Sequence, residues 1–176
     1  MFPIRVTTRC RVDLAGGTLD IWPIGLLHPG ATTVNVAVDL PVRVELRPRS
    51  TGWCVTQGES RVETDVFSEL AGHPDTALVA LVLERGGSPP CELSITSGSP
   101  RGAGLGASSA LTVALLASVE WLLTGATTAT VEQRAAVARD LELAVLLLQR
   151  FLRALAFDGD GGQRRGEGQR GFAQPP

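Results

Sequence analysis

The sequence of 176 residues contains no lysine and no tyrosine, and its 16 basic residues are all arginine. It has only three cysteines, Cys10, Cys54 and Cys91, which are far apart in the chain and form no C-x-x-C pair. Scattered cysteines in odd number favour small core residues over disulfides or metal ligands. The formal net charge is −2, so no basic field indicates nucleic acid or an anionic membrane as a partner.

Sequence signals for a membrane or for export are also weak. The N-terminus lacks the apolar segment of a signal peptide. The most apolar stretch, Ala110 to Leu123, is interrupted by Glu120 and is predicted to be too short to span a bilayer. Hydrophobic residues make up 44% of the chain and charged residues 19%, which is a globular composition. We therefore expect a cytoplasmic protein with no membrane partner.

The first third of the chain has the pattern of strands. Phe2 to Leu14 is extended and rich in valine and threonine, and Thr32 to Arg47 alternates between apolar and polar residues. We expect the second segment to form two strands broken at Pro41, because proline cannot donate to a sheet ladder. Trp53 to Gln57 and Arg61 to Val66 predict two shorter strands. Alternation of this kind is typical of a half-buried antiparallel sheet.

Helices are predicted mainly in the second half. Asp75 to Arg85 predicts a short helix and Cys91 to Thr96 a further strand. A glycine-rich run, Gly98 to Gly106, precedes an almost wholly apolar helix from Ser108 to Leu123, which belongs in the centre of a domain. Another helix is predicted to begin after Thr130. The expected fold class is α+β, with a mostly antiparallel sheet packed on helices.

The composition changes near the end of the chain. The last residues, 158–176, are rich in glycine, glutamine, arginine and proline and contain little that can be buried. Such a segment cannot offset its ordering entropy, so we expect it to be disordered. The domain prediction is therefore one folded lobe at 1–150 and an unrelated tail at 151–176.

The glycine-rich run has the features of a phosphate-binding loop. Gly102, Gly104 and Gly106 allow close approach of a ligand to the backbone, and the following helix start offers free N–H groups to an anion. A Walker-A loop is excluded because it requires a lysine, and the spacing G-x-G-x-G does not fit a dinucleotide-binding loop. A flexible turn before a core helix remains an alternative.

The segment Pro100–Ala110 resembles the second conserved motif of the GHMP kinases (galactokinase, homoserine, mevalonate and phosphomevalonate kinases), of general form P-x-G-x-G-L-G-S-S-A. The resemblance implies binding of ATP with Mg²⁺. Ala107 departs from the motif because the family usually has serine or threonine there. The resemblance then implies either that Ser108 holds the metal or that the metal relies on other oxygens. The implied nucleotide-binding residues are Pro100, Gly102, Ala103, Gly104, Leu105, Gly106, Ala107, Ser108 and Ser109.

The segment Arg11–Asp20 resembles the first motif of the same family, in the branch acting on sugars and sugar phosphates, such as heptose-phosphate kinases and fucokinases. This resemblance implies that Asp20 holds sugar hydroxyls, since a carboxylate accepts two hydrogen bonds from a diol. It also assigns Arg11 as catalytic, near the transferred phosphate. Without the resemblance, Asp20 would be read as a turn cap and Arg11 as an ordinary strand arginine. Gly17 is a further substrate-binding candidate. The segment Thr33–Leu40 also resembles a strand that flanks the substrate pocket in this branch, which makes Asn35 and Asp39 weaker candidates.

The resemblance assigns a metal role to Glu142, on the second helix after the loop. A hard cation that bridges phosphates prefers a carboxylate of this kind, so Ser108 and Glu142 form the predicted magnesium pair. A lone glutamate on a helix also fits an ordinary solvated face. His28 and His73 receive no role.

The resemblance covers residues 4–146 and then stops. The family's following segment, G-x-x-x-G-x-x-D, which contains the catalytic base, has no counterpart at Leu147–Leu152. We expect a truncated or frame-shifted form of an ATP-dependent kinase for a sugar or sugar phosphate, with little or no activity. Open alternatives are an inactive fragment that at most binds nucleotide, and a related decarboxylase or mevalonate-pathway kinase. A fragment of this kind is expected to self-associate through exposed core surface.

Overall fold

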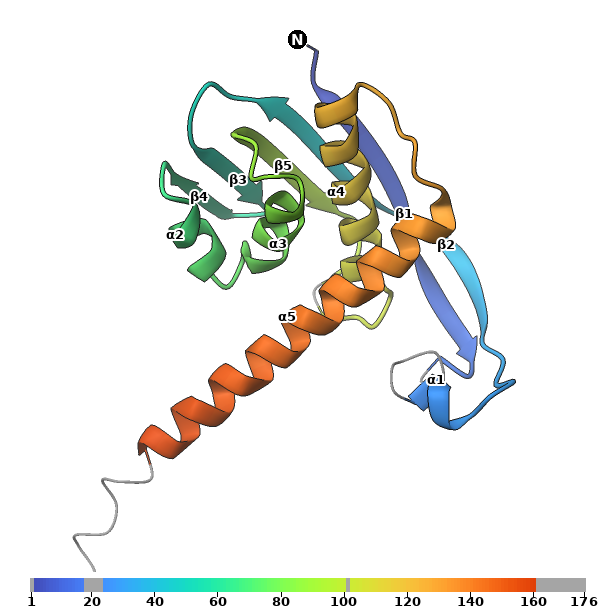
Figure 1. Ribbon diagram of the computed structural model, residues 1–176. Coiled ribbons are helices and arrows are strands. Elements are labelled where there is room, and N and C mark those ends of the chain that lie inside the picture. The colour runs from blue at the N-terminus through green and yellow to red at the C-terminus, as the bar shows by residue number, and fades with distance from the viewer. Residues whose placement is uncertain (1, 18–23, 101, 161–176) are drawn as a thin grey trace, which may run out of the picture. The chain divides into compact units, whose positions relative to one another are not determined.

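The computed structural model describes residues 2–17, 24–100 and 102–160 (Figure 1). The chain divides into two compact units, Met1–Glu142 and Leu143–Pro176. All the described strands lie in the first unit, together with every residue of the candidate site that the structure describes. The sheet, its core and the candidate site therefore belong to Met1–Glu142.

The described strands form one five-stranded sheet with the order β1-β2-β5-β3-β4. Neighbouring strands pair antiparallel except for β3 and β5, which are parallel. This mostly antiparallel sheet confirms the α+β prediction. The strands are β1 (Ile4–Ala15), β2 (Val34–Pro48), β3 (Trp53–Gln57), β4 (Ser60–Thr64) and β5 (Cys91–Ser97).

Helices α2, α3 and α4 pack on one face of this sheet. Helix α4 contacts β1 and β2, α3 packs against α4, and α2 contacts α3 and β4 (Figure 1). The short helix α1 lies in the connection between β1 and β2. The helices are α1 (Ile24–Leu27), α2 (Phe67–Gly72), α3 (Ala77–Arg85), α4 (Ala107–Thr124) and α5 (Val131–Asp160).

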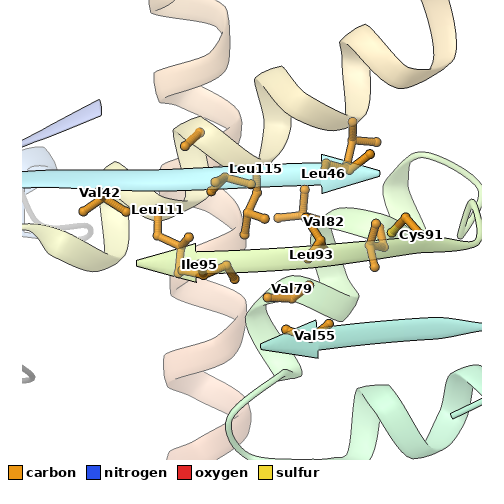
Figure 2. Close-up of a cluster of buried hydrophobic side chains, with 14 of the residues drawn as sticks. Val42, Leu46, Val55, Val79, Val82, Cys91, Leu93, Ile95, Leu111 and Leu115 are labelled. Carbon is orange, nitrogen blue, oxygen red and sulfur yellow. The ribbon is translucent and has the colours of Figure 1, made fainter. Parts of the chain in front are cut away.

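An apolar core lies between the sheet and the helices α3 and α4 (Figure 2). Strands β2 and β5 contribute every second residue, as the alternation in the sequence predicted, and the helices contribute residues one turn apart. The core residues include Val42, Leu46, Val82, Leu93, Ile95 and Leu115, each at most 2% exposed. All three cysteines are free and buried, and burial raises the pKa of the Cys91 thiol to about 12.

The predicted break at Pro41 was wrong, because β2 runs without interruption from Val34 to Pro48. Pro41 lies beside a register shift of the β1–β2 ladder, between the pairs Arg9↔Pro41 and Arg11↔Ala37. It also lies one residue beyond the end of the β2–β5 ladder. Proline is tolerated at such a position because the ladder is irregular beside it on one side and has ended on the other.

Other boundaries differ by small amounts, and the two short helices α1 and α2 were missed. Helix α2 was not predicted, because six residues give too short a pattern to show a helical period. Helix α5 runs to Asp160. Residues 161–176, most of the predicted disordered tail, lie outside the described part, and the predicted domain boundary at residue 150 stays a prediction.

Helix α4 is long and apolar enough to cross a membrane by length and composition alone. The sequence predicted that Ala110 to Leu123 alone is too short to span a bilayer, whereas the whole helix, Ala107–Thr124, is long enough. Ala114 and Leu115 on this helix are fully buried in the core, and α4 contacts two strands. A core helix of a globular domain has the same composition, so packing in the core accounts for its apolar character.

A carboxylate on α4 fixes the loop that leads to α5. Glu120 accepts hydrogen bonds from the backbone N–H groups of Ala129 at 2.7 Å and Thr128 at 2.5 Å, and from Nε of Arg134 at 3.2 Å. The Ala129 N–H and then the Thr128 hydroxyl are the main causes that lower the pKa of Glu120 to about 2. The ionised form is therefore the one that the folded loop binds.

We expect Glu120→Gln to lower the Tm by several degrees at pH 7, because the neutral amide accepts weaker hydrogen bonds. The folded pKa of about 2 lies below the ordinary value of 4.5, so this stabilisation exists above pH 4.5 and is lost as the pH falls toward 2. Thermal melts followed by circular dichroism should show the Tm difference between the two proteins shrinking over that range. A constant difference would contradict the assignment.

Candidate functional site

The glycine-rich run forms an open loop between β5 and α4. Gly102, Gly104 and Gly106 all have positive φ values, of 76°, 70° and 66°. A Cβ atom added at Gly102 or Gly104 would meet nothing within 4 Å, so both face open space. The backbone conformation expected for this loop is therefore present, and its outer side is accessible to a ligand.

Two hydrogen bonds fix the loop and the start of α4 to strand β1. The backbone N–H of Arg11 donates to the carbonyl oxygen of Leu105 at 3.0 Å. At the start of α4, the carbonyl oxygen of Ala110 accepts the hydroxyl of Thr8 at 2.8 Å. These bonds place the end of the glycine loop directly beside Arg11, whose Cγ would be 3.3 Å from a Cβ added at Gly106.

The N-terminus of α4 has the electrostatic character of an anion site. Its N-cap residue, Gly106, provides no side-chain hydrogen bond, and the first turn contains no acidic residue. Helix N–H groups therefore remain available, and the helix dipole favours negative charge at this end. Ser108 is exposed in the first turn, where its hydroxyl can reach a ligand.

Glu142 on α5 is held by hydroxyl groups of α4. Its two carboxylate oxygens accept hydrogen bonds from Ser109 at 2.8 Å and Thr112 at 3.2 Å. Thr112 is fully buried and was missed from the sequence, since a threonine inside an apolar helix carries no functional signal. No hydrogen bond joins Ser108 to Glu142 within the described residues, so the predicted metal pair stays a prediction.

The Glu142 carboxylate and the hydroxyls beside it could supply some, but not all, of the ligands of a magnesium ion. A carboxylate and hydroxyls are ligands that Mg²⁺ accepts, with phosphate oxygens and water completing the shell. The described residues contain no group of three histidine, cysteine, aspartate or glutamate side chains that could hold a metal by itself. The residues present therefore fit a magnesium ion that arrives with phosphate, rather than one held by the protein alone.

The predicted substrate residues meet where the β1–β2 pair extends beyond α4. Asn35 lies opposite Asp13 in the ladder, and a Cβ added at Gly17 would lie 2.7 Å from the Cβ of Asp13. Nε of Arg11 lies 3.2 Å from an Asp13 carboxylate oxygen. Asp13 was not identified from the sequence as a site residue, because the resemblance of Arg11–Asp20 to the first family motif gives it no role. Asp20 lies outside the described residues.

The remaining predicted site residues lie on the strands and in the loop. Asp39 forms an ion pair with Arg9 at 3.2 Å, and both side chains are largely exposed, which is typical of a surface pair of little consequence. Pro100 and Ala103 are exposed in the loop, where the Ala103 N–H lies 3.4 Å from the Pro100 carbonyl oxygen. Ala107 is the first residue of α4.

Comparison with known families identifies one match. Residues 75–146 match the model of the GHMP kinases N terminal domain, a range that includes the glycine loop, α4 and Glu142. The motif around Arg11 lies outside this range. No curated protein sequence matches the chain.

Solved structures agree with this match. A D-glycero-D-manno-heptose 1-phosphate kinase from Bacteroides thetaiotaomicron superposes with a TM-score of 0.65 at 18% identity, over 80% of this chain and 48% of that one. A sugar kinase from Campylobacter jejuni gives 0.59 at 23% identity, over 80% and 44%. Mevalonate kinase from Methanococcus jannaschii gives 0.61 at 15% identity, over 80% and 46%.

These comparisons confirm the resemblance to the GHMP kinases. The chain carries the N-terminal fold of that family. It spans less than half the length of the three solved kinases, 44–48% of each.

Proposed function

We propose that this chain provides the nucleotide-binding half of an ATP-dependent kinase whose substrate is a sugar or a sugar phosphate. The observation that carries the proposal is the loop of three left-handed glycines in front of the uncapped start of α4. This arrangement presents backbone N–H groups and a positive dipole end to phosphate oxygens. Kinases of small molecules depend mainly on such positioning and charge stabilisation.

Each part of the site has a proposed role. The backbone of Gly102 to Ser109 binds the nucleotide phosphates, and Ser108 and Glu142 would hold the magnesium ion. Magnesium, when bound, neutralises charge on the phosphates. Arg11 lies beside Gly106 and Asp13, so its guanidinium is positioned between the loop and the proposed substrate end of β1.

The sugar assignment rests on the polar end of the β1–β2 pair. Asp13 and Asn35 offer a carboxylate and an amide next to each other, which are groups that bind hydroxyls. Two further solved structures are similar to this one. One is galactokinase complexed with galactose, and the other is phosphomevalonate kinase in complex with phosphomevalonate and AMPPNP. We place this chain on the sugar side because its first motif resembles that branch.

A panel of small molecules tests the substrate class. In thermal shift measurements with AMPPNP and Mg²⁺ present, a hexose, a heptose or one of their phosphates is expected to raise the Tm further. Stabilisation by mevalonate or phosphomevalonate instead would assign the chain to the mevalonate-pathway alternative. A coupled ADP-release assay on the same panel measures turnover, and we expect none from this chain alone. Binding of nucleotide without any sugar effect would favour the inactive-fragment alternative.

Glu142→Gln tests the magnesium role. The amide keeps an oxygen for Ser109 or Thr112 but loses the negative charge that a cation requires. We expect the gain in AMPPNP affinity on adding Mg²⁺ to fall about tenfold, by analogy with losses at metal sites. Asp140→Asn removes a charge from an exposed position on the same helix and should leave that gain unchanged. An unchanged magnesium gain in Glu142→Gln would remove this residue from the site.

A further inference from the structure

The sheet has a second face, turned away from α3 and α4, that is polar. On β1 and β2 the side chains of Thr7, Arg43 and Glu45 alternate with the core residues Val42 and Val44. On β1, the Thr8 hydroxyl donates to α4, so this side chain is on the helix-covered face. Successive side chains of a strand point to opposite faces, so the preceding residue, Thr7, is on the outer face. This outer face is thus separated from the glycine loop by the sheet.

Strand register places hydroxyl groups on both sides of one arginine. Arg43 of β2 lies opposite Thr7 of β1 and opposite Thr96 of β5. In the adjacent row, Glu45 lies between Arg5 and Ser94. Cross-strand neighbours of this kind have Cβ atoms about 5 Å apart, within reach of a shared small ligand.

Arg43 is the uncompensated charge in this part of the face. Glu45 accepts Nε of Arg5 at 2.7 Å and Nη2 of Arg47 at 2.6 Å, and these two arginines hold the pKa of its carboxyl below the usual value. The Arg43 side chain makes no hydrogen bond or ion pair within the described part of the chain. Glu92, the other acid nearby, lies opposite Arg47 rather than opposite Arg43.

A shallow hollow of about 220 Å³ lies over these residues. Its polar lining is Arg5, Thr7, Arg43, Glu45, Ser94 and Thr96. The other two lining residues, Val6 and Val44, point their side chains toward the core, so their backbone forms the floor. The hollow therefore combines the Arg43 guanidinium, three hydroxyl donors and the Arg5–Glu45 ion pair above a polar backbone surface.

We propose that this hollow binds a phosphate group, either as inorganic phosphate or as the end of a phosphate monoester. A guanidinium and convergent hydroxyls match the several oxygens of a tetrahedral dianion. A nucleotide base has no stacking partner here, since the described residues of this face include no aromatic ring. Trp53 points to the other side, where its Nε1 donates to the Pro89 carbonyl oxygen and its ring meets Phe67. The site goes beyond the proposed kinase function and does not depend on it.

Titration of inorganic phosphate into the ¹⁵N-labelled full chain tests this site, because amide shifts report each location separately. We expect saturable shifts at Thr7, Arg43 and Thr96. Arg43→Gln should weaken this binding about tenfold, as expected when a charged hydrogen bond is lost. Thr96→Val should weaken it less. A parallel titration with methyl phosphate distinguishes the two possible ligands. If both compounds bind, the site accepts the end of a phosphate monoester. If only inorganic phosphate binds, the ligand is the free ion.

Arg61→Gln is the matched control. Arg61 lies on the same sheet face, is exposed, and is paired with Glu63 at 2.8 Å. Its replacement removes the same charge from the same face but should leave phosphate binding unchanged. The proposal is overturned if Arg43→Gln titrates like the parent chain, if Arg61→Gln weakens binding equally, or if phosphate shifts only the amides of the glycine loop. Circular dichroism melts of both variants confirm that the fold is retained.

Discussion

Gly104→Val is expected to weaken binding of AMPPNP by at least about tenfold. Gly104 has a φ of 70° and faces open space, so a valine there strains the backbone and projects into the volume assigned to phosphate. Both effects act on the loop that carries the proposed function. Isothermal titration calorimetry of the parent and variant chains measures the change.

Gly58→Val separates the two effects. Gly58 in the β3–β4 turn also has a positive φ, of 60°, and a Cβ added there likewise meets nothing within 4 Å. The backbone strain is therefore similar, about 1–2 kcal/mol for a left-handed residue, and the Tm should fall by a similar amount. AMPPNP binding should remain at the parent level. Equal loss of binding in both variants would show that strain alone is responsible.

Leu115→Ala should lower the free energy of unfolding by about 2–5 kcal/mol. Leu115 is fully buried on α4, within the cluster that joins this helix to β2 and β5 (Figure 2). Its truncation leaves a cavity in the middle of the core, where the rigid sheet limits relaxation. Urea unfolding followed by circular dichroism gives the free energy directly.

Leu123→Ala provides the comparison on the same helix. Leu123 is 54% exposed, so the same substitution removes little buried surface and should cost about 0.5–1 kcal/mol. The difference between the two variants tests whether α4 owes its apolar composition to the core. Similar costs for both would contradict the burial of Leu115.

Much of the fold could be predicted from the sequence, because it depends on local patterns. Alternation over residues 42–47 identified a half-buried strand, and the apolar helix after the glycine run identified the core helix. The break predicted at Pro41 was wrong because propensity describes a regular ladder, whereas tertiary context supplied a register shift and the end of the β5 pairing. Helix α2 depends on packing against α3 more than on its own six residues.

The candidate site was predictable only where a motif is contiguous. The glycine loop is such a motif, and its positive φ values agree with the expectation. Asp13 and Thr112 were missed because their roles depend on contacts with Gly17 and Glu142, which only the folded chain brings close. Arg43 was missed for a related reason, since its surplus charge appears only when Arg5 and Arg47 are seen to share Glu45.

The most direct measurement of the central claim is isothermal titration of AMPPNP with Mg²⁺ into the full chain. The glycine loop beside Arg11 predicts saturable binding of one nucleotide per chain, which weakens when Mg²⁺ is removed. Circular dichroism of the same sample establishes that it is folded. Absence of binding by a folded sample would contradict the assignment of the Gly102–Ser109 loop as a nucleotide phosphate site.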